Sequence, residues 1–201
     1  MKNSEAILVT PKQFEIQECA VPEPKDNEIL MKVEYVGMCG SDIHGFEFGP
    51  FIPPKDPNQK IGLGHEVAGE VVKVGANVTK FKVGDKVLIE PGVPDDSCEY
   101  CRTGRYNICP NVDFMATQPN YKGALTQYMT HPEEWTYHIP EGMTTMEAAL
   151  AWILAQGDFI NLLSGSTTVD QIAENVKSAE LELEASDVAM MREMVEAIDK
   201  D

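Results

Sequence analysis

Short runs of β-branched and aromatic residues, separated by glycine and proline, dominate the first 140 residues. Such runs, with turn-forming residues between them, are typical of an all-β barrel or sandwich. They predict strands at 6–10, 13–18, 29–37, 67–75, 86–90, 124–130 and 135–140. Within the stretch EVVKVGANVTKFKVGDKV, residues 70–87, we expect two strands joined by a loop, with Gly75 and Gly84 supplying positive φ angles.

After Pro140 the spacing of apolar residues changes from strand-like to helical. A first helix is predicted to end near Gly157, and residues 159–166 (FINLLSGS) favour a short buried strand. Two more helices are expected, one opening with the capping-box spacing of Thr168 and Gln171 and one after Ser186. The expected fold is mainly β with a helix-strand-helix-helix C-terminal segment, divided into residues 1–148 and 149–201.

The formal charge of −17 limits the partners of this chain. An acidic surface repels phosphate, so we expect neither nucleic acid nor an anionic membrane as a partner. No run of about 18 uncharged apolar residues predicts a membrane span. The N-terminal residues also lack the apolar core of a signal peptide, which favours a cytoplasmic location. A homo-oligomer stays open.

Two motifs carry residues that can bind a metal. GMCGSDIHGF, residues 37–46, contains Cys39, Asp42 and His44, and GLGHEVAGE, residues 62–70, supplies His65 and Glu66. Thiolate, imidazole and carboxylate groups are all ligands of tetrahedral zinc. Each residue alone has an ordinary structural explanation, but the combination is specific.

A third motif, DDSCEYCRTGRYNIC at residues 95–109, places Cys98, Cys101 and Cys109 at C-x2-C-x7-C spacing. An odd total of five cysteines, without a secretory signal, argues against a disulfide framework. Cys19 has no such neighbours. Three cysteines at ligand spacing favour zinc, while a loop that has lost its metal remains the alternative.

GHEVAG, five further residues and then GANV, together with CGSDIH, resemble the zinc signature of the medium-chain alcohol dehydrogenases. The resemblance spans residues 5–151, and IEPGVP and GRYNICPN are similar to the polyol branch, the sorbitol and xylitol dehydrogenases. It implies a GroES-like β-barrel and oxidation of a small alcohol or polyol with zinc and, in these enzymes, NAD(P).

Carried over residue by residue, the resemblance implies a catalytic zinc bound by Cys39 and His65, with Glu66 as a ligand or near-ligand. Asp42 would hold the His65 ring in the orientation that metal binding needs. Ser41 and His44 would pass the proton of the substrate hydroxyl to solvent.

The family also has a structural zinc loop with four cysteines. The position of the first is occupied here by Asp95. The implied ligands are therefore Asp95, Cys98, Cys101 and Cys109, a weaker set because one soft thiolate is lost.

The resemblance ends near residue 151. Trp152 and Ile153 stand where the polyol dehydrogenases have a glutamate and a proline, and no GxGxxG loop of a doubly wound nucleotide domain is present, so no Rossmann domain is expected. Residues 149–201 instead resemble the C-terminal end of an aldo-keto reductase. That second resemblance implies Ser166 and Thr167 near an adenosine phosphate, with Glu174 and Asn175 near adenine.

Three hypotheses follow. The chain is an alcohol dehydrogenase-like domain truncated before its NAD-binding domain and fused to an aldo-keto-reductase-like tail, or it is a catalytically inactive zinc-binding module. An incompletely folded fragment is the third. The first two differ in nicotinamide binding, which only the dehydrogenase requires.

Overall fold

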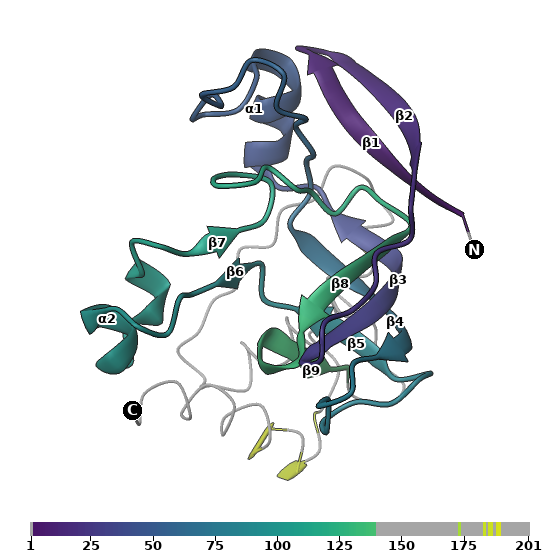
Figure 1. Cartoon of the computed structure of the whole chain (residues 1–201), viewed down its shortest axis with the longest axis vertical. Helices are drawn as coiled ribbons and strands as arrows, with labels where there is room; N and C mark the ends of the chain where they lie inside the picture. Colours follow the sequence, from purple (N-terminus) through teal and green to yellow (C-terminus); the bar gives the residue numbers. More distant parts are fainter. Residues whose placement is uncertain (1, 140–172, 174–182, 184, 187, 190–201) are drawn as a thin grey trace. The chain divides into compact units, whose positions relative to one another are not determined.

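The computed structural model describes residues 2–139, 173, 183, 185–186 and 188–189 (Figure 1). Residues Met1–Cys101 and Tyr106–His138 form one compact unit. Its elements in chain order are β1 (Asn3–Thr10), β2 (Gln13–Cys19), β3 (Glu28–Gly37), α1 (Gly40–Phe48), β4 (Glu66–Val74), β5 (Lys86–Ile89), β6 (Gly92–Val93), α2 (Glu99–Arg102), the 3-10 helix η1 (Tyr106–Ile108), β7 (Asp113–Phe114), β8 (Tyr128–Pro132), the 3-10 helix η2 (Glu133–Trp135) and β9 (Thr136–His138).

The main sheet has five strands in the order β8-β3-β4-β5-β9, and every neighbouring pair is antiparallel. β3 is the longest strand and lies between β4 and β8. Two register shifts interrupt its pairing with β4, at Leu30/Met31 and Val33/Tyr35. Such irregularities bend a strand and increase its twist, which allows the sheet to curl.

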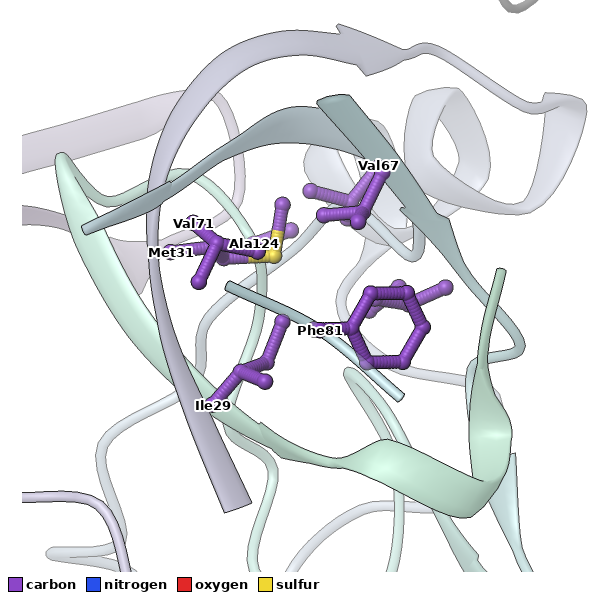
Figure 2. Packing of buried hydrophobic residues seen from close by; sticks show 8 residues of the cluster. Ile29, Met31, Val67, Val71, Phe81 and Ala124 are labelled. Atoms are coloured by element: carbon purple, nitrogen blue, oxygen red, sulfur yellow. The ribbon is translucent and has the colours of Figure 1, made fainter. Parts of the chain in front are cut away.

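The core lies inside this curl. Most of its side chains come from alternate residues of β3, β4 and β5, although the intervening Leu30 and Ala68 are buried as well. The buried cluster consists of Ile29, Met31, Val67, Val71, Phe81, Val87, Ile89 and Ala124. Figure 2 shows the strands curving around these side chains.

Smaller elements surround the sheet. β1 and β2 form a separate antiparallel hairpin, and β6 pairs with β7 in a second two-stranded sheet. α1 begins directly after Cys39, close behind the end of β3. The loop between β6 and η1 carries Asp95, Cys98 and Cys101.

All seven strands predicted in the first 140 residues are present, with bounds shifted by one to four residues. The strand predicted at 124–130 begins only at Tyr128, because Ala124 and Leu125 donate their backbone N–H groups to Gly64 and Leu63 instead of joining the ladder. The strand predicted at 135–140 is confined to Thr136–His138, behind η2. β4 and β5 pair as expected across their loop.

One prediction about the glycines of that loop is wrong. Gly84 has a φ of 96°, as expected, but Gly75 is not among the glycines with positive φ. At Gly75 the constraint is space, because a Cβ there would overlap the backbone carbonyls of Lys25 and Asp26. The residue is needed for a close approach of two chain segments.

The helix-strand-helix-helix predictions fall almost entirely on residues outside the described part, and the boundary at 148/149 stays a prediction. Within the described residues, no helix has the length and apolar character that crossing a membrane requires.

Candidate metal centres

The first candidate centre brings together Cys39, His65 and Glu66. One ligand atom from each lies within 4.8 Å of the others. Cys39 immediately precedes α1, His65 directly precedes β4, and Glu66 is the first residue of that strand. The end of β3 completes the arrangement, since Gly37 is paired with Glu66 and its missing side chain leaves room for the Glu66 carboxylate.

Asp42 ties the two segments together. It is only 2% exposed, and its Oδ2 accepts the backbone N–H of Cys39 at 3.0 Å. Its Oδ1 accepts the N–H of Gly64 at 2.7 Å and lies 3.5 Å from Nδ1 of His65. A carboxylate beside Nδ1 leaves Nε2 of the same ring available as a metal ligand.

Gly64 turns the chain so that His65 reaches this position. Its φ of 87° lies in the left-handed region, and a Cβ there would lie 2.8 Å from Cγ1 of Val36. A side chain at this position would therefore be both strained and crowded.

Ser41 and His44, the predicted proton-relay pair, lie one turn apart on α1. Within the described residues no hydrogen bond joins them, and Nδ1 of His44 is buried without a partner. The His44 ring stacks on Phe51, with centroids 3.8 Å apart and planes at 9°, and contacts Phe48 at 5.2 Å. No sequence motif pointed to Phe51, which lies in the loop after α1 and stacks on His44.

The second candidate centre brings together Asp95, Cys98, Cys101 and Cys109, again with ligand atoms within 4.8 Å of one another. Sγ of Cys98 lies 3.3 Å from Sγ of Cys101 and 3.9 Å from Sγ of Cys109. Oδ1 of Asp95 lies 3.6 Å from Sγ of both Cys101 and Cys109.

Three of these separations match a tetrahedral zinc ion, and the fourth, between Sγ of Cys98 and Sγ of Cys101, is shorter. Zinc bonds of about 2.3 Å to sulfur and about 2.0 Å to oxygen require ligand separations of roughly 3.8 Å between sulfurs and roughly 3.5 Å between oxygen and sulfur. Asp95 occupies the position where the resemblance implies a cysteine. Its Oδ1 lies 3.6 Å from Sγ of Cys101 and of Cys109, close to the separation expected for two ligands of one zinc ion.

The electrostatics of this loop also favour a cation. Burial and the neighbouring thiols raise the pKa of Cys101 to about 12, since a second anion so close is unfavourable. The pKa of Cys98 is lowered, chiefly because the backbone N–H of Cys101 donates to its sulfur. Hydrogen bonds from Asn111 and the Ser97 backbone hold the pKa of Asp95 far below its usual range. A bound metal ion would allow all three thiols to ionise together.

The remaining predicted site residues, Ser166, Thr167, Glu174 and Asn175, lie outside the described residues. Cys19 lies on β2 and belongs to neither cluster.

Comparisons with known proteins agree with the motifs. The family model described as the alcohol dehydrogenase GroES-like domain matches residues 25–141. An uncharacterised zinc-type alcohol dehydrogenase-like protein of Escherichia coli, YdjJ, is 65% identical over 157 residues, which are 78% of this chain and 45% of the relative. Chicken (Gallus gallus) sorbitol dehydrogenase is 46% identical over 140 residues, 68% of this chain and 38% of the relative.

Among solved structures, an Escherichia coli oxidoreductase/dehydrogenase of unknown specificity matches with a TM-score of 0.72 and 62% identity, over 78% of this chain and 47% of that one. The chain therefore spans less than half the length of the proteins it is compared with here.

Proposed function

The chain belongs to the alcohol dehydrogenase GroES-like domain family, and from that premise we propose that it is a zinc-binding, polyol dehydrogenase-like oxidoreductase domain. The observation that carries this proposal is the convergence of a thiol, an imidazole and a carboxylate from Cys39, His65 and Glu66 within 4.8 Å. The similarity to a sorbitol dehydrogenase supports a small alcohol or polyol as the substrate class.

Each residue of the first centre has a role in this proposal. Cys39, His65 and Glu66 hold the zinc ion, and Asp42 fixes the His65 ring through Nδ1. When bound, zinc supplies Lewis-acid chemistry that makes the alcohol oxygen easier to deprotonate. A bound NAD(P)⁺ would supply the acceptor for the hydride that leaves the carbon, and Ser41 and His44 would carry the hydroxyl proton away.

The second centre has a structural role in this proposal. Asp95, Cys98, Cys101 and Cys109 would supply all four ligands of a tetrahedral ion, which would leave no open coordination site for a substrate. Zinc there stabilises the loop between β6 and β7.

The sequence after residue 151 supports the second candidate, a catalytically inactive zinc-binding module. Trp152 and Ile153 replace the glutamate and proline of the polyol dehydrogenases, and an indole cannot bind zinc. In this alternative the chain keeps both metal centres but binds no nicotinamide. The resemblance of residues 149–201 to an aldo-keto reductase, with Ser166, Thr167, Glu174 and Asn175 as cofactor contacts, stays a proposal based on sequence alone.

Nicotinamide binding separates the two candidates. Zinc-loaded full-length protein is titrated with NAD⁺ and NADP⁺ by calorimetry, and then assayed with sorbitol and xylitol by the absorbance of the reduced nicotinamide. Saturable nicotinamide binding, together with turnover that His65→Ala abolishes and Cys19→Ser leaves intact, supports the dehydrogenase. Zinc binding without any nicotinamide affinity contradicts it and supports the module.

A further inference from the structure

The two carboxylate oxygens of Asp95 have different partners. Oδ1 faces the thiols, 3.6 Å from Sγ of both Cys101 and Cys109. Oδ2 accepts a hydrogen bond from the side-chain amide of Asn111 at 2.5 Å. Asn111 follows Cys109 by two residues, so one short segment carries both the last thiol and the amide.

This division matters because a carboxylate can bind a metal through one oxygen or through both. A tetrahedral ion with three thiolates has a single remaining position, which suits one oxygen only. The second oxygen must then be held elsewhere, or the carboxylate can rotate and offer both. An amide donor on Oδ2 provides that restraint.

The backbone hydrogen bonds of Asp95 act on the other oxygen. The backbone N–H groups of Ser97 and Cys98 donate to Oδ1, at 2.9 Å and 3.1 Å. They fix the position of the oxygen that faces the thiols, but they share its lone pairs with any bound cation. The Asn111 bond acts on the opposite oxygen and so orients the group without that competition.

We propose that Asn111 is a positioning residue of the second candidate metal centre, in the segment 95–109 that we call the cysteine loop. It holds Oδ2 so that Asp95 presents Oδ1 alone to the ion. The inference rests on the proposed zinc binding at this loop. In this inference Asn111 allows a carboxylate to bind the ion at the position where the resemblance implies a cysteine.

The test is a double-mutant cycle on zinc affinity. Asn111→Leu removes the donor at similar size, and Asp95→Cys removes the carboxylate on which the donor acts. Both are made singly and together in full-length protein carrying Cys39→Ser, so that only the cysteine loop retains its ligand set. Zinc affinity is measured by competition with a chromophoric chelator.

We expect Asn111→Leu to weaken zinc binding about tenfold. This is near the low end of the loss in metal affinity that is usual when a hydrogen-bond partner of a metal ligand is removed, because the Asn111–Asp95 pair is solvent-exposed. In the Asp95→Cys background the same substitution should change the affinity by less than about twofold. The proposal is overturned if Asn111→Leu weakens zinc binding equally in both backgrounds, or if it does not weaken zinc binding in the protein that retains Asp95.

Asn120 supplies a matched control, because its amide donates to the Asp113 carboxylate at 2.7 Å and 2.9 Å in an exposed pair outside both ligand sets. Asn120→Leu should leave zinc affinity unchanged. With Co²⁺ in place of zinc, Asn111→Leu should weaken the visible absorption typical of tetrahedral cobalt, which separates a change of coordination from loss of fold. If the protein carrying only Cys39→Ser binds no zinc at all, the proposed metal centre itself fails, together with this inference.

Discussion

Asp42 is the residue on which the geometry of the first centre depends most. Its carboxylate contacts the backbone of Cys39 and Gly64 and the ring of His65, and it is nearly fully buried. Asp42→Asn keeps the size of the side chain but replaces one carboxylate oxygen with an amide NH₂ group, which cannot accept a hydrogen bond. The backbone N–H of Cys39, the backbone N–H of Gly64 or Nδ1 of His65 then loses its acceptor.

We therefore expect Asp42→Asn to weaken zinc binding at the first centre by about 10- to 100-fold, as is usual when the partner of a ligating histidine is lost. Chelator competition measures this in protein carrying Cys98→Ser, which disables the second centre. Asp56→Asn is the control, since Asp56 is exposed and outside both ligand sets. Unchanged affinity in Asp42→Asn would show that Asp42 does not position His65.

His131 predicts a pH dependence of stability. The residue is 4% exposed, and burial lowers its pKa from 6.5 to about 4, although the nearby backbone of Glu90 and Trp135 acts in the opposite direction. The native state therefore favours the neutral ring. As the pH falls from 6.5 towards 4, the unfolded chain gains a proton that the folded chain does not, so stability is lost across that window.

The loss should reach at most about 3 kcal/mol, since one pKa unit corresponds to about 1.4 kcal/mol. Urea unfolding of metal-free protein between pH 7 and pH 4 measures it by comparison with His131→Phe, which cannot be protonated. The free energy of unfolding of the variant should fall less steeply over that range. Parallel curves would mean that His131 is not held neutral by the fold.

At this scale the sequence motifs identified the candidate ligands, because ligand chemistry and spacing are local properties. Cys39 and His65 lie in one cluster and the three closely spaced cysteines in another, while their roles as metal ligands stay predictions. Asn111 and Phe51 escaped prediction, since their partners Asp95 and His44 lie 16 and 7 positions away and only the fold defines those contacts.

Strands β3 and β4 are paired along most of their length, and their backbones approach each other closely at Gly69. A Cβ at Gly69 would overlap the carbonyl oxygen of Lys32 and lie 2.9 Å from Cε of Met31, a fully buried residue. Gly69 belongs to the motif GHEVAG, so the same motif supplies a predicted zinc ligand and a packing constraint.

Gly69→Ala should therefore lower the free energy of unfolding by about 1–3 kcal/mol or more, because the backbone of β3 has to move. Gly40→Ala is the matched substitution, since nothing lies within 4 Å of the position of its Cβ and alanine is favoured in helices. Thermal and urea unfolding measure both. Equal stability of the two variants would contradict the tight pairing of β3 and β4.

The short runs of β-branched and aromatic residues between glycines and prolines located the strands, but not α1. The segment Gly40–Phe48 has no apolar stripe, and its buried residues are Asp42 and Gly45. A helix that buries a carboxylate for a ligand histidine cannot be found from hydrophobic periodicity. The bounds of β8 were also missed, because the backbone of Ala124 and Leu125 bonds to the segment before His65.

At the scale of the whole described unit, the cysteine loop is tied to the main sheet. Glu90, just after β5, accepts hydrogen bonds from Tyr106 of η1 at 3.3 Å and Tyr137 of β9 at 3.2 Å. Tyr106 also packs against Trp135, with ring centroids 4.8 Å apart. Order in the loop should therefore stabilise the sheet as well.

Metal removal should consequently lower the melting temperature of the whole unit. Free zinc at about 1,000 times its dissociation constant adds about 4 kcal/mol, which for a chain of this length corresponds to roughly 10 °C. Differential scanning calorimetry with and without a chelator measures the shift, and Cys98→Ser should remove a large part of it. If the chelator lowers the melting temperature of Cys98→Ser by as much as that of the unsubstituted protein, the metal of the cysteine loop contributes nothing to stability.

The most direct test of the account is the zinc content of the purified chain, measured by mass spectrometry on the unsubstituted protein and on variants of each centre. We expect about two zinc ions per chain, about one in either Cys39→Ser or Cys98→Ser, and none when both substitutions are combined. Cys19→Ser should retain the full content. Zinc that survives the combined substitution, or a chain that holds none from the start, would contradict it.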